Sequence, residues 1–193
     1  MVNPYLIHPA TIMEKIREAD SIHTYRLRLN DEETRRNFRF TAGQFNMVYL
    51  FGVGEVAISI VSDPEEPERL DHTIRSVGRV TSAIAQLQPG ETLGIRGPFG
   101  QGWPLDAVRG HDVVIVTGGL GCAPVVGAID YMFRRRRHYG SVKIIHGVKT
   151  SRDLLFHERF EGWGKQPDTE VLLASTRPDE TWRYHVGVVT DLF

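Results

Sequence analysis

The feature that most restricts the fold is a glycine-rich segment that directly follows a run of apolar residues. Residues 113–116 read Val-Val-Ile-Val, and residues 116–124 continue as Val-Thr-Gly-Gly-Leu-Gly-Cys-Ala-Pro. An unbroken apolar run is typical of a strand that is covered on both faces, as in a parallel sheet. Pro124 suits the first turn of a helix. The segment therefore predicts a strand, a glycine loop and a helix in succession.

The glycines of this loop suggest a binding site for a dinucleotide. Glycine allows the backbone to approach a pyrophosphate closely, and the start of the following helix offers unpaired N–H groups to the anion. The spacing is Gly-x-Gly-x-x-Pro rather than Gly-x-Gly-x-x-Gly, so the usual fingerprint is only partly met. The alternative is a tight turn between strand and helix that binds nothing.

The chain divides into two halves with different patterns of apolar residues. Up to about residue 100, short strands alternate with turn residues, which predicts a small antiparallel barrel. Strands are expected at 10–17, 22–30, 45–51, 57–62, 71–77 and 92–96, with a short helix over 81–87. Beyond a linker near 101–110, the apolar runs 142–145 and 171–174 alternate with helical patterns near 122–136 and 151–161. This half predicts a βαβαβ unit with a parallel sheet, so we expect domains at 1–105 and 106–193.

The end of the second parallel strand carries cations where an acid is usual. A carboxylate there commonly holds the ribose of the dinucleotide. Here the strand runs through His146 and Gly147 to Lys149 and Thr150, without a carboxylate. Lys149 and Arg152 would instead meet a 2′-phosphate, which favours NADPH. The alternative is that both are solvated loop cations.

Composition excludes several other classes of protein. The chain has 23 Lys and Arg against 24 Asp and Glu, which gives no reason to expect nucleic acid as a partner. The lone cysteine, Cys122, excludes a disulfide framework and a Cys₄ cluster built by this chain alone. No stretch is apolar enough to insert into a membrane, and the eight histidines form no metal-binding pattern. We therefore expect a cytoplasmic protein with a reduced thiol and no metal site. Residues 134–137 are four arginines, which predict a solvated face or a surface for an acidic partner.

Several ordered motifs resemble one known family. They are Gly43-Gln44-Phe45, Gly-Glu-Val-Ala-Ile-Ser-Ile at 54–60, Arg-Ser-Val-Gly-Arg-Val-Thr at 75–81 and Gly-Val-Lys-Thr-Ser-Arg-Asp-Leu-Leu-Phe at 147–156. With the glycine loop, they resemble the ferredoxin–NADP reductase superfamily, and within it the gamma (diaphorase) subunit of cytoplasmic hydrogenases and sulfhydrogenases. The resemblance extends from about Pro4 to Phe193. It implies an antiparallel barrel that binds FAD, followed by an α/β domain that binds NAD(P)H.

The resemblance also implies that the nucleotide domain is incomplete. Family members continue beyond the position of Phe193 with further strands and a cysteine cluster for a [2Fe–2S] centre, for which this chain has no ligands. We therefore expect a truncated NAD(P)-binding domain whose electrons pass to iron–sulfur or hydrogenase-type partner subunits. The expected activity is NAD(P)H–flavin oxidoreduction. The alternatives are a degenerate scaffold subunit without catalysis and a stand-alone flavin reductase.

Site residues follow from the same resemblance. Ser59 is the catalytic candidate, expected near flavin N5. The other cofactor-binding residues are Val56, Ala57, Ile58, Ile74, Arg75, Gly78, Val80 and Thr81 for FAD, and Gly118, Gly119, Leu120, Gly121, Cys122, Ala123, Pro124, Lys149 and Asp153 for NAD(P)H. Val56 replaces an arginine of the family motif, and Ile58 replaces a tyrosine. The missing guanidinium removes a charge-assisted contact worth roughly 1.5–3 kcal/mol, for which Arg75 or Arg79 would compensate.

Overall fold

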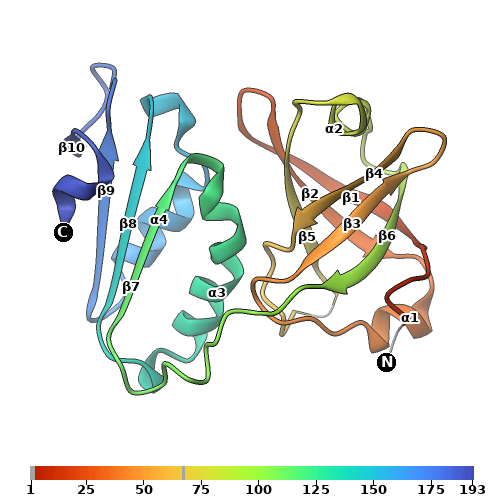
Figure 1. The fold of residues 1–193 in the computed structure, drawn as a ribbon, viewed down its shortest axis with the longest axis horizontal. Coiled ribbons are helices and arrows are strands. Elements are labelled where there is room, and N and C mark those ends of the chain that lie inside the picture. Colours follow the sequence, from red (N-terminus) through yellow and green to blue (C-terminus); the bar gives the residue numbers. More distant parts are fainter. Residues whose placement is uncertain (1–2, 67) are drawn as a thin grey trace. The chain divides into compact units, whose positions relative to one another are not determined.

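The computed structural model describes residues 3–66 and 68–193 (Figure 1). The chain forms two compact units. The first comprises the residues up to Trp103 together with Ala123–Tyr131, and the second comprises Pro104–Cys122 with Met132–Phe193. The domain boundary expected at 105/106 stays a proposal.

The first unit is built on a six-stranded antiparallel sheet. Its strands are β1 (His8–Ala19), β2 (Ile22–Leu29), β3 (Phe45–Leu50), β4 (Gly54–Ser59), β5 (Leu70–Arg75) and β6 (Thr92–Phe99), in the order β4-β3-β6-β1-β2-β5. The edge strands β4 and β5 are linked by one isolated bridge, Ile60 with His72. The expected antiparallel β domain is confirmed, but the ladder is not continuous around a closed barrel. Strand β4 also begins and ends three residues earlier than the predicted 57–62.

The core of this unit comes from the alternation of apolar residues along the strands. Ile12, Leu27, Val48 and Ile95 are at most 1% exposed and belong to one apolar cluster. Burying a side chain of this size stabilises the fold by roughly 1.5–3 kcal/mol. Successive strand residues face opposite sides of the sheet, so exposed residues such as Arg28 alternate with these core positions. Strand β5 is an exception, because Asp71, His72 and Thr73 are buried on it.

Two short helices complete the first unit, and each differs from expectation. Helix α1 (Glu32–Asn37) was not predicted; the carboxylate of Asp31 caps it by accepting from Thr34 N at 2.7 Å. Helix α2 spans Arg79–Ile84, so the predicted range 81–87 lies two to three residues too late. Thr81 Oγ1 accepts from Gly78 N at 3.0 Å, so Thr81 closes the first turn from inside the helix.

The second unit holds the parallel sheet that the apolar runs predict. Its strands are β7 (Val113–Gly118), β8 (Val142–Val148), β9 (Thr169–Ser175) and the short β10 (His185–Val186), in the order β10-β9-β8-β7, and all pairs are parallel. Figure 1 shows β7, β8 and β9 side by side. Strand β7 is an edge strand, and Val114 and Val116 are 57% and 42% exposed. The expectation that residues 113–116 are covered on both faces is therefore wrong.

Of the two helices predicted for this half, the one near 122–136 is found and the one near 151–161 is not. Helix α3 (Ala123–Arg134) follows a 3₁₀ turn, η1 (Gly119–Cys122), and buries Val126 and Ile129. The single helix predicted over 151–161 is wrong. A 3₁₀ turn, η3 (Ser151–Asp153), precedes α4 (His157–Gly164). Phe156, in the left-handed region at φ 54°, lies between them.

Two further 3₁₀ turns, η2 (Arg136–His138) and η4 (Val189–Leu192), complete the fold. The arginine run ends in η2, where Arg136 donates to four backbone carbonyls, those of Pro167, Asp168, Tyr139 and Gly140. Arg136 therefore joins two loops of the second unit, so at this residue neither expected function of the arginine run applies.

Candidate functional site

The FAD residues expected on β4 divide between the two faces of the strand. Val56 and Ile58 are half-buried and pack against the apolar cluster of the first unit, together with Val80 of α2. Ala57 is exposed on the opposite face. An apolar surface next to α2 is what a flavin ring needs, because most of a bound cofactor ring is covered by apolar side chains.

The first turn of α2 supplies the polar part of this site. Its N–H groups have no carbonyl one turn earlier to bond, and the helix dipole favours an anion there. A Cβ placed on Gly78 would meet nothing within 4 Å, so the space in front of the turn is open. The residues present therefore fit a pyrophosphate. Thr81 holds the turn, because Thr81 Oγ1 accepts from both Val77 N and Gly78 N at 3.0 Å.

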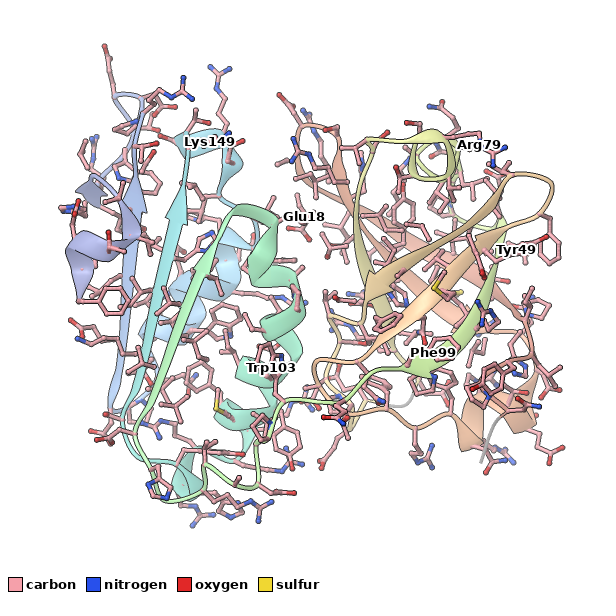
Figure 2. The ribbon with its side chains drawn as sticks, viewed as in Figure 1. Glu18, Tyr49, Arg79, Phe99, Trp103 and Lys149 are labelled. Atoms are coloured by element: carbon pink, nitrogen blue, oxygen red, sulfur yellow. The ribbon has the colours of Figure 1, made fainter. Side chains whose placement is uncertain are left out.

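Arg79 brings a positive charge to the strand that lacks its motif arginine. One guanidinium nitrogen of Arg79 lies 3.6 Å from the position that a Cβ on Gly54 would occupy. Gly54 lies two residues before Val56 and on the same face of β4. Arg79 is the first residue of α2, and its side chain is labelled in Figure 2. Arg75 is also exposed, at the end of β5. Ile74, by contrast, is 3% exposed and its side chain belongs to the core.

Ser59, the catalytic candidate, is the last residue of β4 and is backed by a buried polar network. His72 Nδ1 lies 3.0 Å from the backbone oxygen of Ser59, and His72 Nε2 lies 3.2 Å from Asn46 Nδ2. His72 and Asn46 are both 0% exposed. Burial lowers the pKa of His72 to about 4, although the hydrogen bond to Ser59 acts in the opposite direction. The imidazole is therefore neutral at physiological pH.

The glycine loop after β7 has the geometry that its sequence indicates. Gly118 ends β7, Gly119 has φ +50°, and Pro124 lies in the first turn of α3. A Cβ on Gly119 or Gly121 would meet nothing within 4 Å, so the backbone there faces open space. Leu120 is half-buried, whereas Cys122 and Ala123 are 1% and 4% exposed, so the thiol of Cys122 is enclosed.

Cations gather where β8 and β9 end. Lys149 is exposed at the end of β8, and its carbonyl accepts from Arg177 N at 2.8 Å (Figure 2). Arg177 is an exposed cation that the sequence analysis did not identify. Arg177 could have been found from its position, because it closely follows the third predicted strand and lies at the same edge of the sheet as Lys149. The carboxylate of Asp153 is bound within its own turn, because it accepts from Thr150 N and Thr150 Oγ1 at 2.9 Å.

A second buried histidine lies beside the strand that leads into the glycine loop. His146 on β8 is 0% exposed, and its Nδ1 lies 2.8 Å from Thr117 Oγ1 on β7. Its ring stacks on Phe160 at 4.9 Å between centroids. Burial lowers the pKa of His146 to about 4, so this imidazole is also neutral. The number and spacing of the histidines in the sequence did not indicate that His72 and His146 are buried.

Two negative findings apply to the described residues only. In residues 3–66 and 68–193, no group of three or more His, Cys, Asp and Glu side chains is placed to hold a metal ion. Within the same ranges, no helix is long and apolar enough to cross a membrane.

The fold, which has a glycine turn at the start of a helix in each of its two domains, is that of ferredoxin reductase-like oxidoreductases. Residues 9–103 match the family of oxidoreductase FAD-binding domains, and residues 115–193 match the family of oxidoreductase NAD-binding domains. The chain therefore belongs to this group of flavin- and nicotinamide-dependent oxidoreductases. The cofactors FAD and NAD(P)H that the motifs implied are thereby confirmed at the level of the domain.

Among curated proteins, the chain is similar to the sulfhydrogenase 1 subunit gamma of Pyrococcus furiosus, with 32% identity over 93% of this chain and 62% of the relative. It is also 32% identical to a probable dihydroorotate dehydrogenase B (NAD(+)) electron transfer subunit of Methanocella arvoryzae, over 95% of this chain and 61% of the relative. The chain thus spans about three fifths of the length of these relatives.

Solved structures agree with this assignment. The Amycolatopsis cytochrome P450 reductase GcoB superposes with a TM-score of 0.82 and 26% identity, over 100% of this chain and 58% of that one. A ferredoxin NADP+ reductase from Neisseria gonorrhoeae, solved with FAD and NADP, superposes with a TM-score of 0.78 over 96% of this chain and 75% of that one. Its identity is 20%, so it supports the fold alone.

Proposed function

We propose that the chain is an FAD-dependent NAD(P)H oxidoreductase that works as an electron-transfer subunit. The observation that carries this proposal is the presence, in one chain, of an FAD-type and an NAD-type domain, each with an open glycine turn at the start of a helix. When bound, FAD accepts a hydride from the nicotinamide and passes electrons on singly. This chemistry needs no general acid or base from the protein.

The residues of the chain then have the task of binding and orienting the cofactors. The first turn of α2 and the guanidinium of Arg79 hold the FAD pyrophosphate. Val56 and Ile58 would cover an apolar face of the ring, and Ser59 would contribute the polar group next to its reactive part. In the second unit, the open loop at Gly119 and Gly121 holds the pyrophosphate of the dinucleotide.

We further propose that the dinucleotide is NADPH. Lys149, Arg152 and Arg177 lie at the ends of β8 and β9, where the adenosine ribose binds in sheets of this type. Three cations at that edge complement a 2′-phosphate and offer nothing specific to a ribose diol. Substitution of Lys149 and Arg177 by Ala should raise KM for NADPH and leave KM for NADH nearly unchanged.

Partner subunits of the iron–sulfur, hydrogenase type would accept the electrons. Two relatives are a subunit gamma of a sulfhydrogenase and a probable electron transfer subunit of a dehydrogenase, which supports an assembly with other chains. A cytoplasmic location, in which the buried Cys122 stays reduced, also remains a prediction.

A visible spectrum of the purified chain reconstituted with FAD tests the central proposal. A flavin spectrum that bleaches on anaerobic addition of NADPH is the expected result. Arg79→Gln should weaken FAD binding at least tenfold, because a charge-assisted contact is worth roughly 1.5–3 kcal/mol. Arg75→Gln, which removes the same charge from the end of β5, is the matched control and should have the smaller effect.

The same experiment separates the main alternatives. The apolar residues Val56 and Ile58, which replace the charged and aromatic members of the family motif, favour a scaffold that has lost its flavin. A chain that stays colourless after reconstitution and does not oxidise NADPH would establish the scaffold and overturn our proposal. Rapid reduction of added free flavin without a retained spectrum would indicate a flavin reductase.

A further inference from the structure

The buried pair His72 and Asn46 links three strands of the first unit behind Ser59. Asn46 lies on β3, His72 on β5 and Ser59 on β4. In the order of the sheet, β4 and β5 are the two opposite edges. Just beyond β4, the chain is also joined to β5 by the bridge between Ile60 and His72 and by the bond from Val61 N to Asp71 O at 2.9 Å. The end of β4 is therefore positioned from two sides, by its ladder with β3 and by the imidazole of His72.

The hydrogen-bonding geometry fixes the protonation of this imidazole. A backbone oxygen only accepts, so His72 Nδ1, 3.0 Å from Ser59 O, must carry the proton. His72 Nε2 is then an acceptor, which matches Asn46 Nδ2 at 3.2 Å. One neutral imidazole thus donates to β4 and accepts from β3. A protonated imidazole would turn the contact with Asn46 Nδ2 into one between two donors.

The surroundings leave this network little freedom to rearrange. Asn46 Oδ1 is buried without a hydrogen-bond partner among the described residues. The same oxygen lies 2.4 Å from where a Cβ on Gly97 would stand, so β6 passes close against the amide. Interiors packed in this way transmit small displacements rather than absorb them. A shift of the imidazole would therefore move the peptide of Ser59.

We propose that His72, held by Asn46, is a positioning residue that sets the orientation of Ser59 toward the flavin. The inference rests on the proposed function, because Ser59 has a role only if FAD binds beside β4. His72 itself does not touch the cofactor. It fixes the carbonyl of Ser59 and, through it, the peptide plane and the direction of the hydroxyl.

Two conservative variants separate the two hydrogen bonds. His72→Asn keeps a donor near the position of Nδ1 and loses the bond to Asn46, whereas His72→Gln keeps a polar group near Nε2 and loses the bond to Ser59. His72→Leu removes both. Thr73→Val is the matched control on the same strand, since Thr73 pairs with Thr24 at 2.8 Å in the core and has no contact with Ser59 in the network described.

The readouts are the dissociation constant of FAD, the absorption bands of the bound flavin and its midpoint potential. His72→Leu and His72→Gln should weaken FAD binding about threefold to tenfold, the effect of one net hydrogen bond, and shift the absorption bands. A tenfold change in the relative affinity for oxidised and reduced flavin shifts the two-electron potential by about 30 mV. His72→Asn should restore most of each property, and Thr73→Val should change none.

Two results would overturn the inference and leave the proposed function intact. One is a set of folded His72 variants with the affinity, spectrum and potential of the parent protein. The other is equal behaviour of the Asn and Gln variants, which would mean that His72 acts through general packing. Failure of the parent chain to bind FAD would instead remove the proposed function, and the inference with it.

Discussion

Acidification should destabilise each unit through one buried histidine. His72 lies in the first unit and His146 in the second, and both are 0% exposed with a pKa lowered by burial to about 4. In the unfolded chain the same imidazoles titrate near 6.5. Between these values the unfolded state binds the additional proton and the folded state does not. Stability is therefore complete above about pH 6.5 and falls as the pH drops toward 4.

The size of the effect follows from the two pKa values. Each histidine contributes a slope of at most about 1.4 kcal/mol per pH unit within this window, and a total loss of about 3 kcal/mol at its lower end. The free energy of unfolding of a domain is about 5–15 kcal/mol, so a loss of this size is a measurable fraction of it. Carboxylates also titrate near pH 4, so the contribution of each histidine must be obtained as a difference between variants.

Urea unfolding between pH 7 and 4, followed by amide NMR signals of each unit, measures this difference. His72→Leu should flatten the pH dependence of the first unit only, and His146→Phe that of the second unit only. Imidazole NMR titration of the parent protein provides a direct check, since neither histidine should protonate above pH 5. Equal slopes for parent and variants, or a midpoint near 6.5 for either imidazole, would refute the reasoning.

Three further substitutions test individual contacts by denaturant unfolding. Lys15→Met should destabilise the first unit by about 1–2 kcal/mol, because Lys15 Nζ donates to two carbonyls after helix α2, at 2.7 and 3.0 Å. Gly97→Ala should cost about 2–4 kcal/mol, because its Cβ would stand 2.4 Å from Asn46 Oδ1 and φ is +147°; an unchanged midpoint would contradict that geometry. Val114→Thr should stay within about 0.5 kcal/mol of the parent, because Val114 is 57% exposed, and a larger loss would show that β7 is covered in solution.

The parts of the fold that the sequence predicts are those with local signals. Apolar runs at 142–145 and 171–174 indicated parallel strands, and the glycine loop marked the turn from β7 into α3. Helix α1 was missed although Asp31 and two glutamates after it form an N-terminal capping signal. Its six residues are too few to show helical periodicity.

Other features depend on contacts that no local pattern contains. Leu154, Leu155 and Phe156 fit a helical pattern, yet all three are buried and Phe156 takes a left-handed conformation before α4. Burial of these apolar side chains stabilises the observed conformation more than the weak helix propensity of the segment stabilises a helix. The exposure of Val114 likewise depends on β7 being the edge of the sheet, which its own sequence does not determine.

In the candidate site too, some residues can be predicted from local sequence and others cannot. Motif residues such as Ser59 and Gly118 can be proposed from their spacing, because residues that bind a cofactor recur at fixed positions along a strand or turn. His72 and His146 do not, since their partners are 13 and 29 residues away and on other strands. A neutral imidazole can offer one donor and one acceptor, so one buried ring can join two strands. In both units that ring lies directly beside the last residues of a strand that carries the predicted cofactor segment. Burial lowers the pKa of both histidines, so each ring can hold a neighbouring strand as a neutral group and brings no charge into the interior.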